Sequence, residues 1–395
     1  MEKLTALVTG ATGFIGSHLS CELVKKGFKV YGLSRSGEAK NKEFLEYVKT
    51  GDIEIISADV STIDIQTLPQ VNYIYHVAGK VSVWGDMKEF AQINVLGTKN
   101  MLEYAKLCPQ LKCFTYFSSV AVYGFNGYSN LREDAEFLPM DNNYPISKIL
   151  AEEEVKKNAQ ENKFDYVIVR PGNVYGEYDY TSSYDIYKRV KNQKMLLCGG
   201  GIYESCFVYV GNLVSATIHL SQTEQALNND YNITDGNAYT LIQVLTLIAK
   251  EFKVKPKFKN FPAWMSRVIA GIVEGFYKLF RIKKAPLITK FTVEQNLHDY
   301  SFSMEKTYQT KFRCPFTTEE GIKRTVAWFN SLPENEKKWR IKKWKKKLKK
   351  NWMRLLVTRI KQCHKHWFLL FLLYLSTVIL VLALFLKLHS RILIM

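Results

Sequence analysis

Short apolar runs alternate with amphipathic stretches along the first 170 residues. The runs are rich in β-branched and aromatic residues, as buried strands are, and lie at 4–9, 29–34, 53–57, 73–78 and 114–118. The stretch between the first two carries Leu19 and Leu23 one helical turn apart and ends at Gly27. Strand and helix in alternation predict an α/β fold with a doubly wound parallel sheet.

The pattern changes along the chain and predicts four parts. Residues 1–170 form the sheet domain, and 171–330 form a smaller C-terminal lobe for substrate whose late segments return to the sheet. A basic amphipathic segment covers 331–366, and one transmembrane helix covers 367–386. Within the lobe, 261–280 reads as a helix with a broad apolar surface, which either packs in the core or dips into a membrane.

The last part has the composition of a membrane anchor. Residues 367–386 are twenty uncharged, mostly aliphatic and aromatic positions, enough for a helix to span about 30 Å. Before them, ten of the fourteen residues 337–350 are Lys or Arg. This asymmetry predicts a single-pass tail anchor with the body on the cytoplasmic side, at the endoplasmic reticulum in a eukaryote.

Charge and cysteines narrow the function of the body. The chain has a formal net charge of +18, but residues after 330 contribute about +14 of it. The remaining surplus is too small for a nucleic-acid binder. The seven cysteines show no paired spacing with each other or with histidine, so reduced thiols and no metal site are expected.

A glycine-rich turn follows the first strand directly. It reads Gly10-Ala11-Thr12-Gly13-Phe14-Ile15-Gly16 and opens the first helix. Glycines let the backbone approach a pyrophosphate, and the free N–H groups of the helix start attract its charge. Between two strands, this turn predicts the dinucleotide site of a Rossmann fold, with Gly10, Thr12, Gly13, Phe14, Ile15 and Gly16 at the cofactor.

The ends of the following strands indicate which dinucleotide binds. The second strand ends in Ser34-Arg35, where an NAD enzyme places an acidic residue on the ribose. A hydroxyl and a guanidinium suit a 2′-phosphate, so NADP(H) is favoured, and NAD(H) stays open. Asp59, followed by Val60, is placed to accept from the adenine amino group, and Ala78 ends the fourth strand beside the cofactor.

A second set of residues predicts catalysis. Tyr144 and Lys148 are four apart on one helical face, twenty-five residues after Ser119. The lysine ammonium would lower the tyrosine pKa toward working pH and hold the nicotinamide ribose, making Tyr144 an acid/base. Ser119 would bind the reacting oxygen, and Asn94 would support a proton-relay water.

These motifs together resemble the extended short-chain dehydrogenases/reductases, the NAD-dependent epimerase/dehydratase superfamily. Later landmarks, including Arg170-Pro-Gly-Asn-Val-Tyr-Gly176, are similar to the 3β-hydroxysteroid dehydrogenase branch. The resemblance implies a tetrad of Asn94, Ser119, Tyr144 and Lys148, with Pro171 and Asn173 near the nicotinamide. It also implies a homodimer, because such enzymes often pair through two helices.

The expected activity is interconversion of a secondary alcohol and a ketone on a hydroxysteroid, sterol or related lipid. The alternative is a nucleotide-sugar epimerase or dehydratase, since fold and tetrad serve both. A membrane scaffold that only senses NADP(H) is a third, non-enzymatic reading. Val83 and Trp84 are expected to contact the substrate.

Overall fold

A computed structural model describes residues 3–333 of the chain. Residues 3–329 belong to one compact unit. The basic segment expected at 331–366 falls almost wholly outside the described residues, and the transmembrane helix at 367–386 wholly so. Within 3–333, no helix combines the length and apolar character needed to cross a bilayer.

A seven-stranded sheet forms the centre of the compact unit, and all its neighbouring strands pair in parallel. Its order is β12-β7-β5-β4-β1-β2-β3. The strands are β1 (Thr5–Thr9), β2 (Lys29–Ser34), β3 (Ile53–Ser57), β4 (Tyr73–His76), β5 (Cys113–Phe117), β7 (Tyr166–Pro171) and β12 (Asn229–Ile233). The five strands expected from the pattern lie within two residues of their predicted bounds. The order reverses between β1 and β4, and a ligand site is expected at such a switch point.

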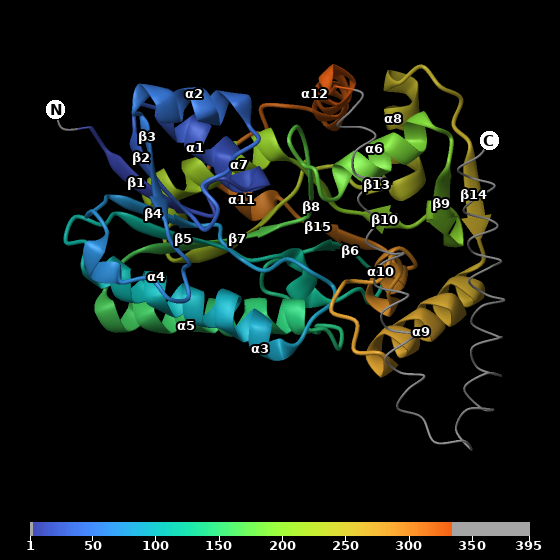
Figure 1. Cartoon of the computed structure of the whole chain (residues 1–395), viewed down its shortest axis with the longest axis horizontal. Helices are drawn as coiled ribbons and strands as arrows, with labels where there is room; N and C mark the ends of the chain where they lie inside the picture. The colour runs from blue at the N-terminus through green and yellow to red at the C-terminus, as the bar shows by residue number, and fades with distance from the viewer. Residues whose placement is uncertain (1–2, 334–395) are drawn as a thin grey trace, which may run out of the picture. The chain divides into compact units, whose positions relative to one another are not determined.

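Helices cover both faces of the sheet (Figure 1). One face carries α1 (Phe14–Lys25), α2 (Lys42–Thr50) and α7 (Val210–Gln222). The other carries α3 (Met87–Phe90), a π-helical turn (Ala91–Leu96), α4 (Gly97–Lys106) and α5 (Asn143–Asn162). Both β12 and α7 come from beyond residue 170, so the large layer contains segments from both sides of that position.

The smaller lobe is assembled from short, distant pieces. Its four-stranded sheet has the order β13-β10-β15-β6, and two further pairs are β11-β8 and β14-β9. The strands are β6 (Tyr128–Leu131), β8 (Asn173–Tyr175), β9 (Met195–Cys198), β10 (Glu204–Ser205), β11 (Phe207–Tyr209), β13 (Tyr239–Thr240), β14 (Phe258–Phe261) and β15 (Tyr300–Phe302). The later helices are α6 (Ser183–Lys191), α8 (Leu241–Glu251), α9 (Ala263–Leu279), α10 (Lys290–Gln295), α11 (Glu305–Gln309) and α12 (Thr318–Ser331).

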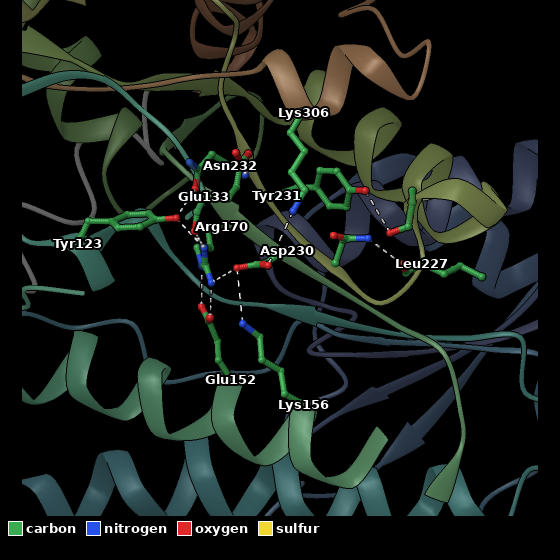
Figure 2. Close-up of polar contacts among 12 residues, drawn as sticks. Tyr123, Glu133, Glu152, Lys156, Arg170, Leu227, Asp230, Tyr231, Asn232 and Lys306 are labelled. Atoms are coloured by element: carbon green, nitrogen blue, oxygen red, sulfur yellow. Dashed lines mark hydrogen bonds and ion pairs between the residues drawn. The ribbon is translucent and has the colours of Figure 1, made fainter. Parts of the chain in front are cut away.

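A buried arginine ties α5, the helix that carries Tyr144 and Lys148, to the sheet (Figure 2). Arg170 on β7 is 1 % exposed and donates from Nε and Nη2 to the two oxygens of Glu152 on α5, at 3.0 and 2.7 Å. Its Nη2 also pairs with Asp230 on β12, and its Nη1 donates to the Tyr123 hydroxyl. Because Glu152 lies one turn beyond Lys148, this cluster fixes the part of α5 that carries the predicted lysine.

Candidate active site

The glycine turn has the close approach that its sequence predicted. Gly10 has a φ of +67°, and a Cβ added at Gly16 would lie 2.2 Å from the Gly10 carbonyl oxygen, so a side chain at Gly16 cannot fit without movement. Gly13 caps α1 without a side-chain hydrogen bond, and the first turn holds no acidic residue. The N–H groups at the start of α1 are therefore available to a pyrophosphate.

A cavity of about 440 Å³ opens over this turn at the ends of β1, β2, β3 and β4. Eight predicted cofactor residues line it: Gly10, Thr12, Gly13, Ser34, Arg35, Asp59, Val60 and Ala78, which lies two residues past the end of β4. Five further residues that were not predicted from the sequence also line it: Leu33, Ser36, Ala58, Gly79 and Ile93. The first four lie beside strand ends that were predicted, and Ile93 is next to Asn94 in the π-helical turn. This lining fits a dinucleotide.

The adenosine end of the cavity has mixed charge. The Ser34 and Thr12 hydroxyl oxygens lie 2.5 Å apart, and Arg35 is mostly exposed with its Nη1 3.8 Å from Asp59. Asp59 accepts from the Ser61 N–H at 2.9 Å, and this bond, with Arg35 contributing less, lowers the pKa of the Asp59 carboxyl. The guanidinium is thus within reach of a 2′-phosphate, but a carboxylate stands beside it.

Other predicted cofactor residues lie elsewhere. Phe14, Ile15 and Gly16 form the first turn of α1 behind the glycine loop and are absent from the cavity lining. Pro171 ends β7, and Asn173 begins β8. The Asn173 amide donates to the Tyr300 hydroxyl at 2.7 Å and accepts from Gln295 at 3.1 Å, so its side chain belongs to the smaller lobe.

Ser119 and Tyr144 come together past the end of β5. Tyr144 enters α5 at its first turn, where the Asn142 side chain caps the helix by accepting the Tyr144 N–H at 2.9 Å. The pKa of Tyr144 is raised by burial, against the smaller lowering effect of a hydrogen bond with Ser119. The hydroxyl is therefore protonated at neutral pH and can donate a proton to a carbonyl oxygen.

Lys148 does not lower the Tyr144 pKa as the sequence predicted. Its Nζ donates to the Phe117 carbonyl oxygen at 2.6 Å and lies 4.9 Å from the centre of the Tyr116 ring. Burial lowers the pKa of Lys148 to about 8, while the carboxylate of Glu152 acts in the opposite direction. The spacing put both residues on one helix face, but a backbone acceptor on β5 directs the ammonium.

Asn94 is buried in the π-helical turn and holds the loop after β4. It accepts the Lys80 N–H at 2.6 Å and donates to the Lys80 carbonyl and to the Ser147 hydroxyl, at 3.2 and 2.8 Å. A Cβ added at Gly79 would lie 3.2 Å from the Lys148 Nζ and 3.4 Å from the Asn94 Oδ1. Asn94, Lys148 and the cavity-lining Gly79 therefore share one location, and π-helical turns often mark such sites.

Val83 and Trp84 lie on a loop between the catalytic helix and the smaller lobe. The Asn142 amide donates to the Val83 carbonyl at 3.1 Å, and Val83 packs on the same apolar cluster as Tyr144. The Trp84 indole donates to the Ile282 carbonyl at 2.9 Å and meets the Tyr277 ring edge-on at 6.0 Å. This loop therefore links Tyr144 to the end of α9.

Fold and site together define a nicotinamide-dependent oxidoreductase that acts on CH–OH groups: a dinucleotide cavity at the switch point reaches Gly79 beside Lys148, on the helix that also carries Tyr144. Comparison with known proteins agrees. Residues 6–234 match the model of the NAD dependent epimerase/dehydratase family, and the chain belongs to that family.

Its relatives have several activities. The chain is 25 % identical over 338 residues to 2-alkyl-3-oxoalkanoate reductase of Shewanella oneidensis, covering 82 % of this chain and 85 % of that protein. It is also 25 % identical over 347 residues to mouse dTDP-D-glucose 4,6-dehydratase, covering 84 % and 90 %. UDP-glucuronic acid 4-epimerase from Bacillus cereus, solved in complex with NAD, shares the fold at a TM-score of 0.66 and 18 % identity, over 83 % of this chain and 99 % of that one. The hydroxysteroid branch is not confirmed by these comparisons.

Proposed function

We propose that the chain oxidises a secondary alcohol of a nucleotide-activated sugar, as the first step of an epimerisation or dehydration. The observation that carries the chemistry is the contact of the cavity-lining Gly79 with Lys148 and Asn94. Tyr144 lies on the same helix as Lys148, with a side-chain hydrogen bond to Ser119. The substrate class is supported by the family and by relatives that act on sugar nucleotides. This is the alternative that the sequence left open, and it has more support than the hydroxysteroid reading.

The residues have separate tasks in this proposal. Ser119 and Tyr144 bind the reacting oxygen; in its deprotonated form Tyr144 accepts the proton of the alcohol during oxidation, and it returns this proton to the carbonyl oxygen when the ketone is reduced. Lys148 keeps a positive charge at the cofactor ribose below a pH of about 8, and Asn94 fixes the loop at Gly79. A bound nicotinamide would supply the hydride chemistry.

A lipid-like ketone is a second candidate substrate, because the surroundings of Tyr144 are apolar. Tyr144 packs on a cluster that includes Val120, Phe125, Phe291 and Tyr300. Among the described arginines, the buried one, Arg170, is occupied by Glu152 and Asp230 and not offered to a substrate diphosphate. The relative named 2-alkyl-3-oxoalkanoate reductase supports the same candidate.

For the cofactor, we propose NADP(H), with NAD(H) as the alternative. Arg35 and Ser34 supply a cation and a hydroxyl where the 2′-phosphate would lie. The Asp59 carboxylate, 3.8 Å from Arg35, would repel a 2′-phosphate. The NAD bound to the Bacillus cereus relative also favours NAD(H).

One assay separates the two substrates. The purified full chain is first incubated with NADP⁺ or NAD⁺ and a panel of UDP- and dTDP-sugars. It is then incubated with NADPH or NADH and a panel of 2-alkyl-3-oxoalkanoates and ketosteroids. Sugar turnover without net change in nicotinamide absorbance is the expected result. Loss of absorbance in proportion to added ketone, with no sugar turnover, would replace the first candidate by the second. Turnover of neither panel would contradict both.

A further inference from the structure

Exposed apolar side chains of the described residues concentrate on one helix of the smaller lobe. Of the ten large hydrophobic residues that are most exposed, Trp264, Val268 and Leu279 belong to α9, at 67, 51 and 61 % exposure. Leu287, at 61 %, lies in the loop that follows. An apolar concentration of this kind on a protein surface usually marks an interaction site.

These residues form a single stripe. At 100° per residue, Trp264, Val268, Gly275 and Leu279 fall within about 60° around the helix. A Cβ built at Gly275 meets nothing within 4 Å, so the stripe faces open space. The opposite side of α9 carries the buried Ser266 and Ala270, and Ala270 packs with Val293 and Leu297. The inner face of α9 therefore packs against the rest of the lobe, whereas the outer stripe is not part of the lobe's core.

The border of the stripe is basic. Lys278, Arg281 and Lys283 are exposed at the C-terminal end of α9 and just beyond it. The nearby acidic side chains are occupied: Glu294 pairs with Arg267, and Glu274 accepts the Lys290 N–H at 2.6 Å. Apolar residues bordered by cations match an anionic lipid surface, where the rings and aliphatic chains enter the interface and the cations meet headgroups.

The sequence beyond the described residues has the same chemistry. Ten of the fourteen residues 337–350 are Lys or Arg, and 367–386 are twenty uncharged residues. We propose that the outer stripe of α9, with Leu287 and the three border cations, lies on an anionic bilayer surface. The loop contact of Trp84 with Tyr277 and Ile282 would then place the catalytic helix in the part of the enzyme nearest the lipid.

Trp264 allows a direct test with the full chain. The protein is bound to vesicles containing phosphatidylserine, with or without brominated acyl chains, which quench tryptophan at short range. The Trp264 signal is the difference between wild type and Trp264→Phe. We expect this difference to disappear in brominated vesicles and to remain in the unbrominated ones.

A matched variant reports on the other side of the molecule. Leu45→Trp, made in the Trp264→Phe background, places an indole at an exposed position of α2, on the sheet domain (Figure 1). Its signal should survive brominated lipid. Equal quenching at both positions, or none at Trp264, would overturn the proposal.

A second measurement tests whether protein, and not lipid, covers the stripe. Without lipid, acrylamide should quench the Trp264 difference signal, because the stripe faces water. A Trp264 signal shielded from acrylamide in lipid-free protein would mean that the chain's own C-terminal segment or a second copy covers the stripe, and would refute the lipid surface. Leu279→Glu should reduce the quenching by brominated lipid while Leu45→Glu leaves it unchanged.

Discussion

The dinucleotide half and the smaller lobe are built in different ways. The dinucleotide cavity is lined by residues at the ends of four adjacent parallel strands, and its glycine turn is one continuous segment of seven residues. The smaller lobe draws its four-stranded sheet from β6, β10, β13 and β15, which are spread over residues 128–302. One half is therefore specified by local sequence, and the other by contacts between distant segments.

The two halves meet at α5, and the strongest test of the comparison is there. Tyr144→Phe removes the hydroxyl that holds the proton but keeps the ring in its apolar cluster. Turnover should fall by about 10²- to 10⁴-fold, while cofactor affinity, measured by nicotinamide fluorescence titration, stays within about twofold.

The adjacent serines provide the control for that experiment. Ser119 hydrogen-bonds with Tyr144, whereas the buried hydroxyl of Ser118 has no hydrogen-bond partner among residues 3–333. Ser119→Ala should lower kcat, and Ser118→Ala should not. Equal kcat values for Tyr144→Phe and wild type would remove Tyr144 from the proposed role.

The next effect concerns the buried Arg170 cluster that attaches α5 to the sheet. Arg170→Met leaves the buried Glu152 without its cation, and such a loss costs about 3–5 kcal/mol of unfolding free energy, while the half-buried Asp230 keeps Lys156 and Lys306. The matched variant is Arg267→Met, which breaks an exposed pair with Glu294 and should cost less than about 1 kcal/mol. Urea unfolding at neutral pH measures both. Similar midpoints would show that the cluster does not hold α5 against the sheet.

The same contrast explains how much could be predicted from the sequence. The parallel sheet, the glycine turn and most of the cavity followed from periodicity and short motifs, because their partners are neighbours in the sheet. The role of Arg170 did not, since its partners lie eighteen residues before it and sixty residues after it. The Tyr144 pKa was predicted in the wrong direction, because helical spacing says nothing of the burial that raises this pKa or of the Phe117 carbonyl that receives the Lys148 ammonium.

A smaller effect is expected in the dinucleotide half, where the site is specified by local sequence. If the 2′-phosphate is held by Arg35, Arg35→Ala should raise the KM for NADPH about 10-fold, the size of one charge-assisted hydrogen bond, and leave the KM for NADH unchanged. Asp59 keeps its bond to Ser61 in this variant, so the adenine side stays intact. Arg281→Ala, at an exposed position of the smaller lobe, is the control. A parallel change for both cofactors would assign Arg35 to stacking on adenine and favour NAD(H).

The last effect is a pH dependence at the boundary between the halves. Burial lowers the pKa of Lys148 from 10.5 to about 8, so between these values the folded chain has released a proton that the unfolded chain still holds. Because the unfolded state binds more protons there, this group makes stability rise with pH from about 8 to 10.5, and its contribution is lost as pH falls through 8. Lys148→Met should lack that rise, whereas Lys99→Met, at a surface pair with Glu154, should keep it. Urea midpoints of the three proteins at pH 7 to 10 measure the difference. Parallel curves for wild type and Lys148→Met would mean that the ammonium is solvated in solution and that the loop at Gly79 opens to water.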